Sequence, residues 1–154
     1  MTQFLRSARA MACTLLLFPV LAQGAQSATA LSAQSAAPRT ASAAQGVNVS
    51  LTLRNSSTMV QTVSFGRSSA QECATAPHVR VLRVGSREVV YPAGEPRFCT
   101  QELRSESVPA QGSVTLSRTL NLPAGEYMIE VWAKGFLNDE MVFIPADPLR
   151  VSVK

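Results

Sequence analysis

The residues that could do chemistry in this chain are few and widely spaced. His78 is the single histidine, and it stands in no pattern that pairs a general base with a serine or cysteine nucleophile. Asp139, Glu140 and Asp147 lack the spacing of an oxygen-ligand loop for calcium. The cysteines and the histidine likewise fit no zinc-ligand spacing. The sequence therefore predicts a non-enzymatic protein without a metal site or a cofactor.

Cysteine pairing is the one covalent chemistry that the sequence favours. Cys13 lies in an apolar N-terminal stretch, so removal of that stretch would leave Cys73 and Cys99 as an even pair. In an oxidising compartment such a pair favours a disulfide, which would stabilise the fold by roughly 3–4 kcal/mol. Two free thiols are the alternative.

Residues 1–30 have the pattern of an export signal. Arg6 and Arg9 precede an apolar stretch over residues 10–22, and Ala28-Thr29-Ala30 fits the A-x-A cleavage pattern. The apolar stretch is short for a membrane span, so an anchor is the less favoured alternative. We therefore predict an exported protein in the periplasm, the cell envelope or the extracellular space. Membrane contact is expected only through an uncleaved signal segment.

The remaining chain divides into a lead-in and one domain. Residues 31–46 are rich in Ala, Ser, Gln and Thr without an apolar stripe, which predicts a flexible lead-in. Residues 47–154 are enough for one domain with a modest core. Loss of two signal arginines would lower the formal charge from +4 to about +2, and the other arginines are scattered among acids. Without a basic stripe, no nucleic-acid partner is expected.

Period-two alternation predicts β-strands in residues 47–154. Pro123-Ala124-Gly125 predicts a turn, and Tyr127 at the start of the next strand is typical of the corner in immunoglobulin-like sandwiches. The pattern predicts an all-β, antiparallel two-sheet immunoglobulin-like sandwich of seven to eight strands, with a closed barrel as the alternative. Its predicted core positions include Val49, Leu51, Leu116, Leu120, Tyr127, Ile129 and Val131.

The order of features from Val47 to about Val131 resembles the BsuPI-type intracellular proteinase inhibitor domain. The matching features are VSLTLRN from Val49, VSF at Val63 to Phe65 followed by Gln71, the strand ending at Gly85, Val89-Val90-Tyr91, Phe98 with Thr100 and Gln101, Val108-Pro109, and Leu122 to Gly125 before Tyr127. This resemblance implies an immunoglobulin-like sandwich and inhibition of a subtilisin-type serine protease. The chain departs from the family by its export signal and by Cys73 and Cys99.

Two apolar features near the C-terminus are candidate partner-binding surfaces. Trp132 lies on the strand face opposite the predicted core positions, and residues 135–148 are more apolar than a plain connection requires. The candidate partner-binding residues are Trp132, Phe136, Leu137, Met141 and Phe143. The alternatives are a Trp covered by a neighbouring loop and a long hairpin in which the apolar residues pack.

These features together predict an exported, non-enzymatic protein-binding domain. The resemblance to BsuPI-type inhibitors implies that its partner is a serine protease, which it would inhibit sterically because the chain has no reactive constellation. The alternative is a structural or assembly module of the cell envelope with no protease target.

Overall fold

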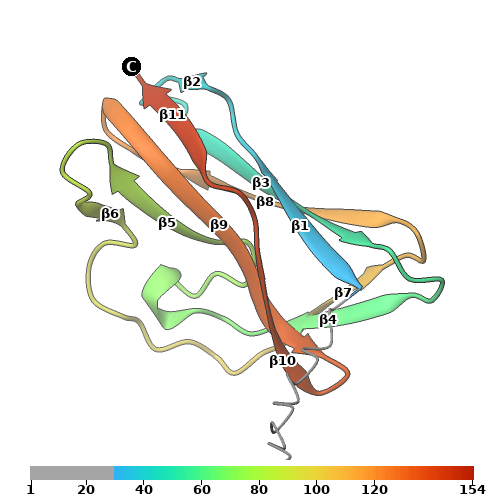
Figure 1. Ribbon diagram of the computed structural model, residues 1–154. Helices are drawn as coiled ribbons and strands as arrows, with labels where there is room; N and C mark the ends of the chain where they lie inside the picture. The colour runs from blue at the N-terminus through green and yellow to red at the C-terminus, as the bar shows by residue number, and fades with distance from the viewer. Residues whose placement is uncertain (1–29) are drawn as a thin grey trace, which may run out of the picture.

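The computed structural model describes residues 30–154 as two β-sheets packed face to face (Figure 1). The predicted export signal lies outside the described residues, apart from Ala30. The strands are β1 (Leu31–Ala36), β2 (Thr40–Ala41), β3 (Val47–Asn55), β4 (Gln61–Phe65), β5 (His78–Arg83), β6 (Val89–Tyr91), β7 (Arg104–Val108), β8 (Ser113–Leu120), β9 (Gly125–Leu137), β10 (Glu140–Pro145) and β11 (Leu149–Val153). Within residues 30–154 the one helical element is the 3₁₀ turn η1 (Ser69–Gln71), and no helix there is long and apolar enough to cross a bilayer.

Strand β9 is the central strand of the larger sheet. It runs the length of the molecule in Figure 1 and pairs with β10 and β11 along one edge and with β4 and β5 along the other. Strands β6 and β7 extend the sheet beyond β5 and β4, and β2 extends it beyond β11. The smaller sheet has the order β1-β3-β8. The predicted two-sheet all-β sandwich is therefore confirmed.

The core consists of the alternating inward positions of both sheets. All seven core positions named from the sequence are buried, and Val49, Leu51, Tyr127 and Ile129 have no exposed surface. Burial of each large apolar side chain contributes roughly 1.5–3 kcal/mol. The strand periodicity alone therefore identified the correct buried face.

The predicted corner at Tyr127 is present. The Tyr127 hydroxyl donates a hydrogen bond to the Pro123 carbonyl oxygen at 2.8 Å, four residues upstream. The Tyr127 ring is fully buried, and the Arg83 guanidinium lies 5.7 Å from its centroid. This tyrosine closes the connection between β8 and β9, as in immunoglobulin-like sandwiches.

The prediction of a flexible lead-in at residues 31–46 is wrong. Strand β1 pairs with β3 over six residues, and β2 pairs with β11 in the one parallel pairing of the described sheets. Small residues gave this segment no apolar period, yet alternating positions of β1 still face the core, and Leu31 is buried. The backbone hydrogen bonds at the sheet edges order the segment. These two strands help to raise the count to eleven, above the predicted seven to eight.

Residues 66–77 interrupt the edge of the larger sheet. Strands β4 and β5 both pair with β9, and the residues between them leave the sheet and return to it. Near the end of β4, Gly135 of β9 approaches the backbone of Ser64. A Cβ added at Gly135 would stand 2.5 Å from the Ser64 carbonyl oxygen. Close backbone approach therefore requires glycine at this position. We call residues 66–77 the excursion.

Replacement of Ile129 by Ala tests the assigned faces of β9. The free energy of unfolding should fall by roughly 2–5 kcal/mol, because the change leaves a cavity between the sheets. Met128→Ala on the opposite face is the matched control and should cost less than about 1 kcal/mol. Equal losses in urea unfolding of the two variants would contradict the assignment.

Candidate functional site

Aromatic and sulfur-containing side chains gather on the outer face of the larger sheet. The strand register places His78 of β5 beside Trp132 of β9, Phe143 of β10 beside Lys134, and Met141 beside Phe136. The ring centroids of His78 and Trp132 are 6.0 Å apart, and those of Trp132 and Phe143 are 6.1 Å apart. We define the aromatic face as His78, Trp132, Phe136, Met141 and Phe143.

All residues of the aromatic face except Phe136 line a shallow hollow of about 820 Å³. Strands β5, β9 and β10 form its floor, and Gln71 of the excursion and Pro92 border it. Arg80 and Glu130 form an ion pair across β5 and β9, with 2.6 Å between nitrogen and oxygen. The hollow therefore combines an apolar floor with charged groups at its border.

The structure brings together most of the predicted partner-binding residues. Trp132, Met141 and Phe143 line the same hollow, and Phe136 lines a smaller adjoining hollow of about 320 Å³ that also includes Met141. Leu137 lies on the inner side of β9 and packs against the core, so it is not part of this surface. The alternative of a long hairpin with packed apolar residues is correct for part of residues 135–148. The hairpin β9–β10 exists with Val142 and Ile144 buried, while its odd-numbered β10 residues project outward.

His78, the first residue of β5, lies on the outer side of the sheet within the aromatic face. The side chain is buried, and the pKa of its imidazole lies below the ordinary value of 6.5, chiefly because of burial and then because of the positive charge of Arg118. A hydrogen bond to the backbone of Lys134 raises the pKa of His78, but this effect is smaller than the lowering by burial and Arg118. The imidazole is therefore neutral at pH 7, and it stacks on Trp132.

A cation from the smaller sheet holds the excursion in place. Arg118 of β8 donates a hydrogen bond from Nη1 to Gln71 Oε1 at 2.7 Å, and the same oxygen accepts the Val79 backbone N–H at 3.0 Å. The Arg118 guanidinium also lies 5.5 Å from the centroid of the Tyr91 ring. Burial is the main reason why the pKa of Tyr91 is raised. Arg118 therefore joins the excursion, β5 and β6 to the opposite sheet.

The sequence analysis did not predict that Arg118 would link the two sheets, although its position in the strand pattern is unusual for a charged residue. Arg118 stands at an inward position of an alternating strand, between Leu116 and Leu120. A charged side chain at an inward position needs a specific hydrogen-bond or ion-pair partner to offset the cost of burying it. The partner, Gln71, is 47 residues away in the chain, so only the folded structure could identify it.

The predicted disulfide is confirmed, and it anchors a second exposed feature. Cys73 of the excursion is bonded to Cys99, with 5.4 Å between their Cα atoms. Cys99 lies in the segment 92–103, which runs between β6 and β7 without strand or helix and which we call the tethered loop. An ion pair of 2.8 Å between Arg67 and Glu102 provides another attachment. The loop is therefore exposed but held at several points.

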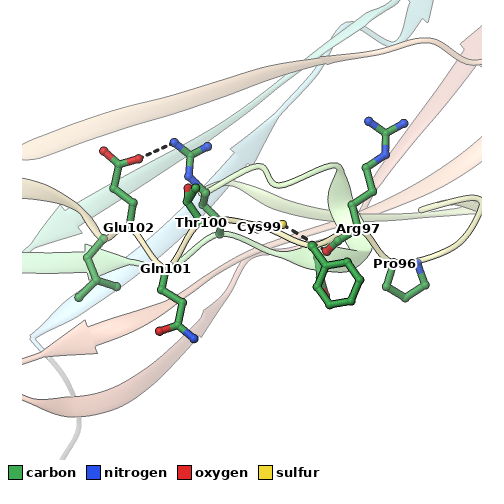
Figure 2. Close-up of a pocket in the computed structure, with 11 residues that line it drawn as sticks. Pro96, Arg97, Cys99, Thr100, Gln101 and Glu102 are labelled. Atoms are coloured by element: carbon green, nitrogen blue, oxygen red, sulfur yellow. Dashed lines mark hydrogen bonds and ion pairs between the residues drawn. The ribbon is translucent and has the colours of Figure 1, made fainter.

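A hollow of about 720 Å³ runs along the tethered loop (Figure 2). Figure 2 shows Arg97 and Gln101 pointing to opposite sides of the loop, with Cys99 between them. Phe98, in the same loop, is fully exposed. This hollow shares Gly66 and Arg67 with the smaller hollow at Phe136, which itself adjoins the aromatic face. The tethered loop and the aromatic face are therefore neighbouring parts of one surface.

Comparisons with known proteins give little further information. No protein-family model matches the chain, and no curated protein matches it. A solved structure, described as the X-ray structure of Northeast Structural Genomics Consortium target SoR45, is similar with a TM-score of 0.48 and 9% identity. That similarity covers 80% of this chain and 87% of the other. The resemblance to BsuPI-type inhibitors therefore stays a prediction from the sequence.

Removal of the disulfide should lower stability without changing the fold class. Cys73→Ser together with Cys99→Ser should reduce the free energy of unfolding by roughly 2–4 kcal/mol, since the bond closes a sequence separation of 26 residues. Denaturant unfolding measures this loss. Mass spectrometry of the unreduced wild-type chain after alkylation supplies the control, and two alkylated thiols there would contradict the bond.

The titration of His78 should make stability depend on pH. Because its pKa is lowered in the folded state, the unfolded chain binds a proton first as the pH falls below 6.5. The His78 contribution is therefore fully present above pH 6.5 and is lost as the pH falls through the lower folded-state pKa. His78→Phe keeps a ring beside Trp132 and should lose less stability between pH 7.5 and pH 5 in urea unfolding. If the free energy of unfolding changed with pH in the same way for the wild type and for His78→Phe, the lowered pKa of His78 would be contradicted.

Proposed function

We propose that this chain is an exported, non-catalytic protein-binding domain that inhibits a serine protease sterically. The observation that supports this most is the exposure of the aromatic face. Met141, Phe143 and Phe136 are 67%, 61% and 44% exposed, and they lie beside the half-buried Trp132. Such a contiguous apolar surface is typical of interaction sites.

The composition of this surface also favours a protein partner. Trp, Phe and Met are enriched at the centres of protein interfaces, where a few large side chains carry most of the binding energy. Lys134 and the Arg80–Glu130 pair border the hollow and would form a polar rim. The hollow is open and shallow, so it fits a protein surface better than an enclosed small molecule.

The side chains around the aromatic face favour steric action over catalysis. His78 is neutral and stacked on Trp132, and the hydrogen bond that acts on its pKa is with the backbone of Lys134 rather than with a serine, threonine or cysteine side chain. An activated nucleophile requires such a partner. Inhibition would therefore consist of occupying the active-site cleft of the protease.

The disulfide supports the proposed location. The Cys73–Cys99 bond is compatible with an oxidising compartment outside the cytoplasm. The export pattern of residues 1–30 gives independent sequence support. Both observations support an exported location, which is where a secreted protease would be met.

Affinity capture tests the proposed function. The full chain, exported by its host and immobilised, is incubated with extracellular and envelope fractions. Eluted proteins are then labelled with a fluorophosphonate, which marks active serine hydrolases. We expect a labelled protease whose activity falls when the free domain is added. Recovery of envelope components alone would favour the structural role and contradict inhibition.

Replacement of both Met141 and Phe143 by Ser should weaken binding of the captured protease by about 2 kcal/mol or more, the scale of interface hot spots. Both side chains are mostly exposed, so the free energy of unfolding should change by less than about 1 kcal/mol. A binding titration beside a melting curve separates the two effects.

Met59 and Val60 offer a matched control for this double variant. Their side chains are 69% and 61% exposed, close to the values of Met141 and Phe143, but they lie in the connection between β3 and β4. Replacement of both by Ser should leave binding unchanged. Equal weakening by the two double variants would count against the aromatic face.

A further inference from the structure

Phe98 has the highest exposed fraction of the large hydrophobic side chains in residues 30–154, at 109%. It stands between two fixed backbone positions. The Arg97 backbone N–H donates to the Ser69 carbonyl oxygen at 2.9 Å, and Cys99 is bonded to Cys73. The tethered loop therefore presents one large apolar side chain from a restrained backbone.

These restraints reduce the conformational entropy that the loop would lose when it binds a partner. A flexible loop must be ordered by its partner, whereas a loop already fixed by a disulfide and hydrogen bonds binds with less loss of freedom. The attachments at Arg97 and Cys99, with the Arg67–Glu102 ion pair beyond them, restrain the backbone on both sides of Phe98. The loop forms no strand or helix, so its backbone is not part of a sheet ladder in this structure.

We propose that Phe98 enters the specificity pocket of the target protease and that the tethered loop occupies its substrate cleft. This inference rests on the proposed function and names the residue that selects the partner. The partner is a serine protease whose specificity pocket accepts a large aromatic side chain, as a hydrophobic slot does and a pocket with a buried carboxylate does not. The aromatic face then contacts the protease beyond its cleft, because the two surfaces adjoin.

The position of the disulfide gives this loop a further property. If the protease hydrolyses the bond between Phe98 and Cys99, one water is added and the chain separates between the two residues. Cys73 and Cys99 lie on opposite sides of the break, so the disulfide keeps both fragments together. The cleaved domain would remain one molecule until it is reduced.

Variants of Phe98 test the inference with three proteases as probes: subtilisin, chymotrypsin and trypsin. The exported full-length chain is assayed for inhibition of each with a small chromogenic substrate. We expect the wild type to inhibit subtilisin or chymotrypsin, and Phe98→Ala to weaken that inhibition by about 100-fold or more. Phe98→Lys should transfer inhibition to trypsin, because its pocket binds a cation. Met59→Ala is the control and should inhibit as the wild type does.

Melting curves test whether the variants are folded. Because the Phe98 ring is fully exposed, its replacement should leave the melting temperature unchanged. Wild-type inhibition by both Phe98 variants would overturn this inference and leave the proposed function standing. Failure of the wild type against subtilisin and chymotrypsin, with failure of Phe98→Lys against trypsin, would also overturn it. The affinity capture described above then decides independently whether a protease is the partner.

Discussion

The backbone pairing of β9 with four other strands is the constraint on which the candidate site depends. Because β9 is 13 residues long and pairs with two strands along each edge, its pleat fixes which side chains face the core and which face outward. Tyr127, Ile129 and Val131 are buried between the sheets, while Trp132 lies on the outer face. A shift of one residue would exchange these faces, and the large loss of buried area opposes it.

The loops beside this sheet are held by fewer and more specific interactions. Arg118 reaches the excursion through Gln71, and the Cys73–Cys99 bond joins the excursion to the tethered loop. A half-buried guanidinium of this kind stabilises only when its partners satisfy it, so loss of Gln71 would leave a charge poorly compensated. The sheet supplies a rigid support, and these contacts position the exposed residues upon it.

The exposed apolar residues divide into two kinds of surface. The aromatic face lies on regular strands, so its shape follows from the register of β5, β9 and β10. Phe98 projects from a loop that is held by its attachments rather than by sheet pairing. Loops carried on a rigid scaffold are a common means of presenting binding residues. In the proposed inhibitor, the loop would select the protease and the sheet face would add contact area.

The sequence by itself determined the all-β class, the buried faces of the strands, the corner at Tyr127 and the cysteine pair, because each follows from local periodicity, turn chemistry or elimination. It also named Trp132, Met141 and Phe143 as candidate partner-binding residues, and the structure brings these three together around one hollow. The prediction of a flexible lead-in at residues 31–46 was wrong, because the small side chains there show no apolar period while pairing with distant strands imposes strand structure. Only the tertiary structure decided that β9 continues as one strand to Leu137 and so turns that side chain inward, that Arg118 meets Gln71, and that Phe98 is exposed beside the disulfide. Each of these depends on residues distant in the chain, whose meeting local patterns do not encode.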